Sequence, residues 1–140
     1  MSVRNRLDPQ EALICTMVLI AAADGGMTDR EIGVMAAQVQ TLPVFRGFSS
    51  SHLSAASDAA VALLHETEGL SHAAQLIREA LDPKLRETAY ALACEVVAAE
   101  HSAGQEVLRM LEFVREELDL DSLVAAAIER GVRVRYRALA

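Results

Sequence analysis

The stretch AAADGGMTDREI (residues 21–32) is the first place where the sequence changes character. An apolar run ends at Asp24, two glycines follow, and Thr28 stands three residues before Glu31. Glycine adopts the left-handed backbone that ends many helices, and a Thr followed three residues later by a Glu forms a capping box at the start of a helix. The stretch therefore predicts a connection between two helices. Its acidic residues also raise the question of whether this connection binds a ligand.

The segment before this connection predicts a helix at the centre of the fold. Asp8 and Pro9 combine an N-cap residue with a proline at the first helical position, and Glu11 follows in the first turn. The helix reads PQEALICTMVLIAAAD and is apolar on nearly all sides, which is typical of a buried helix. The apolar run at 12–23 is shorter than the roughly 20 residues that cross a bilayer. We therefore expect a core helix and no membrane span.

The segment after the connection predicts an amphipathic second helix that ends near Gln40. Four residues follow the spacing of a buried helical face, namely Ile32, Met35, Ala36 and Val39. Pro43 and Gly47 interrupt the helical pattern, and the loop between and after them holds Phe45 and Phe48. We expect this aromatic pair to close the helix bundle. A partner-docking role for the pair is the alternative.

Helix signals recur along the rest of the chain. We expect a third helix over 51–68 that ends at Gly69, a fourth capped by Ser71, a fifth begun by Asp82 and Pro83, a sixth capped by Ser102 that reaches about Leu118, and a seventh from Asp121 to Gly131. Seven helices with short connections predict a bundle-like domain.

The C-terminal arm, residues 132–140, has a different pattern. It reads VRVRYRALA, so that apolar side chains alternate with arginines, which is typical of an extended strand or arm. We expect the arm to lie across the protein's own acidic surface, with its valines and its tyrosine packed inward. Docking to a partner protein or to anionic lipid headgroups is the alternative.

Composition favours one all-α domain over residues 1–140. Apolar residues make up 52% of the chain and aromatic residues only 4%, which suits closely packed helices. The net charge of −7 argues against a nucleic-acid surface. Cys15 and Cys94 fall in apolar segments and are predicted to be reduced core residues. The chain shows no secretory leader and no activated nucleophile, so we expect a cytoplasmic protein that is not an enzyme.

An approximate internal repeat relates the hairpins at about 9–42 and about 82–118. The four apolar positions of the second helix recur at a constant offset of 75 residues, as Val107, Met110, Leu111 and Val114. Glu106 matches Glu31 at the same offset, and Glu100 matches Asp24 after a one-residue gap. Connections of about four residues predict that the helices of each pair are antiparallel neighbours. The chain thus predicts a duplicated, pseudo-twofold helix hairpin.

The pattern AAADG-x-x-Thr-x-x-Glu, repeated in degenerate form after about 75 residues, resembles the tellurite-resistance TerB-like family. The resemblance covers nearly the whole chain. It implies an all-α fold with related hairpins and a divalent-metal or charged-ligand site at the two hairpin junctions. It also implies a bacterial cytoplasmic protein that acts in stress-response assemblies with other proteins, with at most peripheral membrane association, and that is not known as an enzyme.

Carried onto this sequence, the resemblance assigns metal ligands to acidic residues at the two junctions. The candidates are Asp24, Glu31, Glu100 and Glu106, with His101 next to them. Carboxylate oxygens suit Ca²⁺, Mg²⁺ or Mn²⁺, and an imidazole would shift the preference toward Zn²⁺ or Ni²⁺. The structural alternative is that the two Glu residues serve as helix caps and first-turn acids, while the Asp is a turn residue.

These observations leave two functions open. The first is a TerB-like tellurite or stress-resistance protein that binds a divalent cation at the hairpin junctions. The second is a metal-free helical adaptor that joins proteins of a stress-response assembly through Phe45, Phe48 and the arginine-rich arm. His52, His65 and His72 lack ligand spacing and are expected at the surface, although His65 with Glu66 and Glu68 forms a weak second metal hypothesis. The sequence does not determine the oligomeric state.

Overall fold

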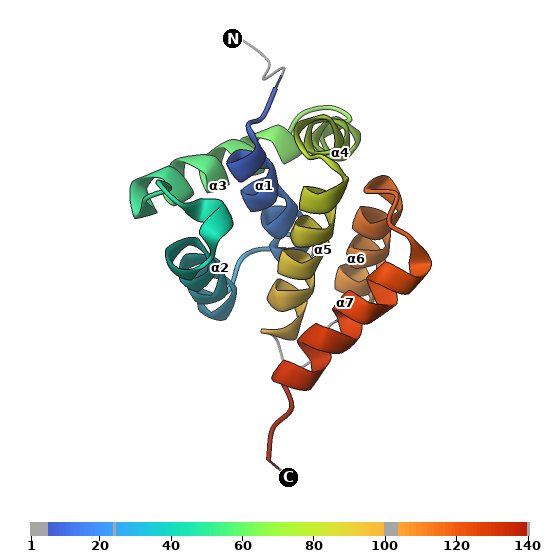
Figure 1. The fold of residues 1–140 in the computed structure, drawn as a ribbon. Coiled ribbons are helices and arrows are strands. Elements are labelled where there is room, and N and C mark those ends of the chain that lie inside the picture. The colour runs from blue at the N-terminus through green and yellow to red at the C-terminus, as the bar shows by residue number, and fades with distance from the viewer. Residues whose placement is uncertain (1–5, 24, 100–103, 140) are drawn as a thin grey trace.

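A computed structural model describes residues 6–23, 25–99 and 104–139. The described ranges form seven α-helices and one short 3₁₀ helix, with no strand among them. The elements are α1 (Pro9–Ala21), α2 (Asp29–Thr41), η1 (Pro43–Phe45), α3 (Ser50–Leu64), α4 (Gly69–Ala80), α5 (Pro83–Ala98), α6 (Gln105–Glu117) and α7 (Ser122–Arg135). Figure 1 shows these helices gathered in one bundle-like domain. The all-α prediction is confirmed, and no helix in these ranges has the length and hydropathy to cross a bilayer.

Helix starts follow the local capping rules. The Asp8 carboxylate accepts from the Glu11 amide at 2.8 Å, while Glu11 Oε1 accepts from the Asp8 amide at 3.0 Å. Thr28 Oγ1 accepts from the Glu31 amide at 3.2 Å, and Glu31 Oε1 accepts from the Thr28 amide at 2.8 Å. Two amides at each helix start are thereby satisfied. The predicted N-cap at Asp8 and the predicted capping box at Thr28 are confirmed, and Asp8 forms a capping box with Glu11 as well.

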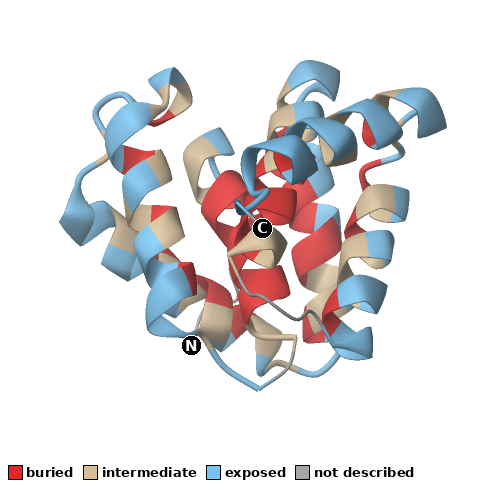
Figure 2. Cartoon of the chain, turned by 90° about the horizontal axis from the view of Figure 1, so that it is seen from below, coloured by how far each residue is buried: buried red, intermediate tan, exposed pale blue. Residues whose placement is uncertain are grey.

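Helix α1 is the core of the molecule. Every residue from Ala12 to Ala21 is buried, and α1 packs most extensively against α5, then against α3, α4 and α6. Figure 2 shows the buried residues concentrated on the central helices, with exposed residues on the outer ones. The phenyl ring of Phe45 is buried beside that of Phe48, with 5.6 Å between ring centroids, and both pack against the core. The central position of α1 and the closing role of the aromatic pair are as predicted.

The first connection is longer than the sequence suggested. Helix α1 ends at Ala21, Gly25 has φ of 109°, and α2 begins at Asp29, so residues 22–28 separate the two helices. Residues 99–104 separate α5 from α6. Both connections exceed the four residues expected. The pseudo-twofold duplication of the two hairpins stays a prediction.

The buried face of α2 is narrower than predicted. Met35 and Val39 are buried and Ala36 is half-buried, but Ile32 is 46% exposed. Helix α2 packs against α3, α5 and η1 and has only a small contact with α1. Ile32 therefore lies outside the face of α2 that packs against the rest of the molecule.

Two glycines predicted to end helices do not do so. Helix α3 ends at Leu64, and Gly69 is the first residue of α4, preceded by Glu68 with φ of 58°. Ser71 therefore lies inside α4 and does not cap it. Gly131 lies in the interior of α7, which continues to Arg135.

The C-terminal arm is therefore helical in its first part, and the prediction of a strand or arm over 132–140 is wrong for residues 132–135. Ala125 and Val132 are buried and Ile128 packs against the core, so their spacing places them on one helical face. Tertiary packing of that face against α5 overrides the short alternating pattern.

Candidate functional site

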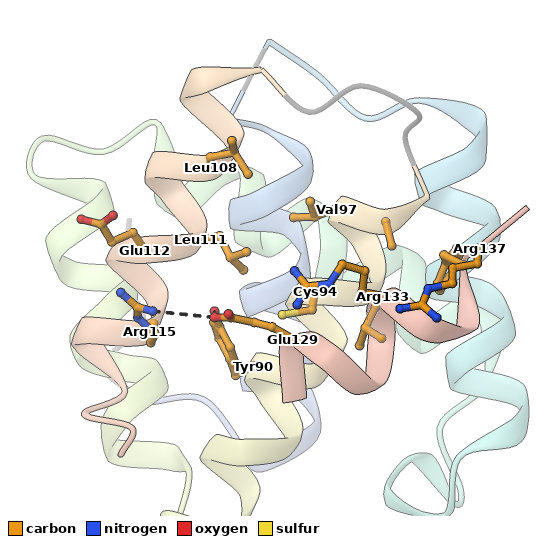
Figure 3. A pocket seen from close by; sticks show the side chains of 13 residues that line it. Tyr90, Cys94, Val97, Leu108, Leu111, Glu112, Arg115, Glu129, Arg133 and Arg137 are labelled. Atoms are coloured by element: carbon orange, nitrogen blue, oxygen red, sulfur yellow. Dashed lines mark hydrogen bonds and ion pairs between the residues drawn. The ribbon is translucent and has the colours of Figure 1, made fainter. Parts of the chain in front are cut away.

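A concave site lies between α5, α6 and α7. It is an open pocket of about 550 Å³, within the range of small-molecule sites. Figure 3 shows side chains from all three helices directed toward it. Its apolar lining consists of Val97, Ala98, Leu108, Leu111 and Val132.

Helix α6 exposes part of its apolar surface to this pocket. Val107 and Val114 of α6 are buried against the core, whereas Leu108 is 51% exposed and Leu111 is half-buried. These leucines lie to one side of the core-facing stripe and therefore form a wall of the pocket. No described residue covers this apolar wall, so it is available to a ligand or a partner.

A hydrogen-bonded group of three side chains joins the helices at one side of the pocket. The buried Tyr90 of α5 donates its hydroxyl to Glu129 Oε2 of α7 at 2.5 Å. Arg115 Nη1 of α6 lies 3.7 Å from the same carboxylate oxygen. Burial first, and then the hydrogen bond to Glu129, raises the pKa of Tyr90. The phenol therefore remains a hydrogen-bond donor that joins α5 to α7, and the ion pair of Arg115 with the same carboxylate joins α6 to α7.

A second group attaches the end of α7 to α5. The Glu95 side chain, only 4% exposed, pairs with Arg135 and accepts the Tyr136 hydroxyl at 2.5 Å. Glu95 follows Cys94 in a run of buried residues, so its carboxylate is removed from water. Its two partners compensate for the lost hydration. The two carboxylates Glu129 and Glu95 thus hold α7 along the pocket at two points.

Because of Tyr136, alkaline pH is expected to lower the free energy of unfolding measurably. Burial, then the hydrogen bond to Glu95, raises the pKa of Tyr136 from 10.0 to about 12. Because the folded state disfavours the phenolate, this stabilisation is complete below pH 10 and is lost as the pH rises through about 12. The chain has two tyrosines and no tryptophan, so ultraviolet absorbance of tyrosinate reports both groups directly.

We expect both tyrosine side chains to ionise above the ordinary pH range for a phenol in the folded protein. In denaturant we expect both to ionise within that range. The variant Tyr136→Phe assigns the remaining signal to Tyr90, and its free energy of unfolding is expected to fall less between pH 10 and 12. Titration of Tyr136 near 10 in folded protein would contradict the hydrogen bond to Glu95.

The thiol in the pocket is not an activated nucleophile. Burial raises the pKa of the Cys94 thiol to about 12, so at neutral pH the thiolate is scarce. Neither Cys15 nor Cys94 forms a disulfide, and both are buried, as the sequence predicted. The pocket therefore offers apolar surface and neutral hydrogen-bonding groups at its base.

The pocket rim carries a cationic edge. Arg133 and Arg137 line the pocket, and within the described residues neither makes a hydrogen bond or ion pair with another side chain. Figure 3 places them on the α7 side, across the pocket from Glu112 and Arg115 of α6. The helix dipole favours positive charge near the C-terminus of α7. The two arginines therefore lower the stability of the fold only a little.

The predicted metal ligands are only partly placed. Asp24, Glu100 and His101 lie outside the described residues. Glu31 is buried, and its carboxylate is engaged in the capping box of α2. Glu106 is exposed in the first turn of α6, as the structural alternative predicted. The parts of the chain that are described contain no group of three or more metal-ligating side chains.

The other histidines are placed much as expected. His52 is exposed, and its Nδ1 accepts from the Ser49 amide at 3.1 Å, so it helps to cap α3. His65 is exposed as well. The second metal hypothesis paired His65 with Glu66, but Glu66 Oε1 instead lies 3.3 Å from Nδ1 of His72.

Sequence reasoning missed the residues that build the pocket. Tyr90, Glu95 and Glu129 meet their partners about 40 positions away in the chain, and only the packing of α7 on α5 creates these contacts. One signal was present: Glu95 is a charged residue inside the apolar run ALACEVVA. A carboxylate in a buried helix requires a partner, so the run itself predicted a pairing, although not its partner.

Comparisons with protein-family models, with curated proteins and with solved structures find no match for this chain. The TerB-like resemblance therefore rests on the repeated motif alone.

Proposed function

We propose that this protein is a non-catalytic binding protein of the TerB-like kind, that it acts in a bacterial stress-response assembly, and that the pocket between α5, α6 and α7 is its binding site. The observation that carries the proposal is a preformed apolar pocket of about 550 Å³, in which two Tyr–Glu hydrogen bonds join α5 to the α7 segment and the Arg115–Glu129 ion pair joins α6 to α7. A site held in this way loses little conformational entropy when it binds. The pocket includes Arg133 and Arg137 of the arginine-rich arm but neither Phe45 nor Phe48.

A matched pair of alanines in the chain allows a direct test in cells. Ala98 lines the pocket at the end of α5, and Ala126 is exposed on α7 outside it. Ala98→Trp fills the pocket, whereas Ala126→Trp adds the same side chain at the surface. A bacterial strain without the gene is challenged with tellurite and with other stresses while each variant is supplied at equal abundance.

We expect loss of the gene to increase sensitivity, and the wild type and Ala126→Trp to restore resistance. Ala98→Trp is expected to fail although its melting temperature stays near that of the wild type. Full rescue by Ala98→Trp would show that the pocket is not the binding site. A strain without any stress phenotype would instead contradict the stress role.

A divalent-cation site at the hairpin junctions is a second proposal, favoured by the direction of the helices. Helices α1 and α5 pack side by side and run the same way in Figure 1, so that their caps, Ala22 and Ala99, lie at one end of the bundle. The first turns of α2 and α6, with Glu31 and Glu106, begin from that end. Negative charges gathered at one end repel each other, and a bound cation relieves this repulsion.

Melting temperatures of chelator-treated protein test the cation proposal. Titration with Ca²⁺, Mg²⁺, Mn²⁺, Zn²⁺ and Ni²⁺ is expected to give a saturable rise, since a ligand at 100 times its Kd stabilises by about 2.7 kcal/mol. Asp24→Asn and Glu100→Gln are expected to abolish the rise. Glu31 is unsuitable as a variant, because its loss also removes a helix cap. If no ion shifts the wild type, the cation proposal is wrong and the acids are caps and turns.

A further inference from the structure

The charges around the α5–α6–α7 pocket select a class of ligand. Glu129 is engaged by Tyr90 and Arg115, and Glu95 is engaged by Arg135 and Tyr136, so these carboxylates are already neutralised by partners. The remaining strong charges that line the pocket are Arg133 and Arg137 on one side and the exposed Glu112 on the other. The α7 side therefore carries two positive charges that lack an internal counter-charge among the described residues.

This cationic edge stands out against the rest of the molecule. The chain has a net charge of −7, yet arginines cluster at 130–137. A general acidic surface repels anions, so an anion gains attraction only close to Arg133 and Arg137. Guanidinium groups form charge-assisted, often bidentate hydrogen bonds with carboxylates and phosphates, which are stronger than neutral ones.

The apolar part of the pocket adjoins this edge. Val97 and Ala98 of α5 and Val132 of α7 line the same cavity as the two arginines, and Leu108 and Leu111 close it from α6. An apolar ligand body lying against the leucines would leave its head within the arginine edge. A cation of the same shape would face two uncompensated positive charges.

We infer that the pocket binds a small amphipathic anion, with an alkyl or acyl body against α6 and a carboxylate or phosphate head between Arg133 and Arg137. The inference rests on the proposed function, because it names the ligand class of the same site. It requires no bond making or breaking. The thiol of Cys94, with its pKa raised to about 12, stays a neutral part of the lining.

Isothermal titration with four probes below their micelle concentrations tests this inference. Decanoate and decyl phosphate share the body and differ in the head, decylammonium reverses the charge, and acetate lacks the body. We expect saturable 1:1 binding of decanoate, of decyl phosphate or of both, and the tighter of the two identifies the head that the site prefers. Decylammonium and acetate are expected to bind at least tenfold more weakly.

Variants then separate the pocket from general surface charge. Arg133→Gln with Arg137→Gln is expected to weaken the anionic probes about tenfold or more, because two charge-assisted hydrogen bonds are lost. Leu111→Gln tests the apolar wall in the same way. Arg130→Gln, on the same helix but outside the pocket, is the matched control and is expected to change the Kd less than twofold. Circular dichroism and melting temperature establish that each variant is folded.

Four results would overturn the inference. Equal affinity for decylammonium and decanoate would mean that the arginines do not select the head. An equal loss in Arg130→Gln would mean that the attraction is diffuse charge. Binding to phosphatidylglycerol vesicles that is unaffected by Leu111→Gln, without binding of the free probes, would assign the arginines to a membrane surface. Failure of every probe, together with failed rescue by Ala98→Trp in cells, would reject this ligand class and leave the proposed function intact.

Discussion

Replacement of Gly69 by alanine is expected to destabilise the protein by about 3 kcal/mol, at the upper end of the usual cost of overpacking. A Cβ at this position would lie 2.4 Å from the carbonyl oxygen of Leu63 and 2.8 Å from that of Leu64. Both obstacles are backbone atoms in the tight connection between α3 and α4, so a side-chain rotation cannot relieve the clash. Equilibrium unfolding in urea measures the loss, which corresponds to a fall in Tm of about 10 °C.

Gly131→Ala is the matched control for this prediction. Gly131 lies in the interior of α7, and apart from the nearby backbone of α7 itself no described part of the chain lies within 4 Å of the position its Cβ would take. Alanine costs less backbone entropy in a helix than glycine, so this change is expected to stabilise by about 0.5–1 kcal/mol. Equal effects of the two substitutions would contradict the close approach at Gly69.

The second large effect is expected from the double variant Arg135→Gln with Tyr136→Phe. It leaves the Glu95 carboxylate, whose side chain is 4% exposed, without the two partners that now satisfy it. Removing the partner of a buried charge costs about 3 kcal/mol or more. We expect a loss near 3 kcal/mol in urea unfolding at pH 7.

Removing the carboxylate instead of its partners is expected to lower the free energy of unfolding much less. In Glu95→Gln the Arg135 side chain, 65% exposed, keeps its hydration, and the amide oxygen can still accept from Tyr136. We expect a loss of about 1 kcal/mol. If Glu95→Gln costs as much as the double variant, the free energy comes from the pair itself and the desolvation argument is wrong.

Features encoded by local chemistry were predicted well from the sequence. The caps at Asp8, Thr28, Asp82 and Asp121 depend only on neighbouring residues, and all four accept hydrogen bonds from the first turn of their helices. The burial of α1 followed from its uniformly apolar composition. Such signals do not depend on which other helix lies nearby.

The errors occurred where tertiary contacts decide the outcome. In the sequence, Gly69 and Gly131 both resemble glycines that end a helix. In the structure, Gly69 is needed for a close backbone approach and Gly131 lies within a helix. The alternation of the C-terminal arm predicted an extended segment, but packing of Val132 and pairing of Arg135 with Glu95 extend the helix. The sequence did not predict the pocket, because its walls come from three helices that meet only in the folded structure.

The central claim is that the pocket between α5, α6 and α7 is a preformed site for an anionic amphiphile. Methyl-resolved NMR of the wild type during titration with decanoate tests it most directly. We predict saturable shifts at Val97, Leu108, Leu111 and Val132, with no change at the exposed Leu123 or at the buried Ile14. Shifts centred on other methyl groups, or no saturable shift at any of these four, would contradict the account.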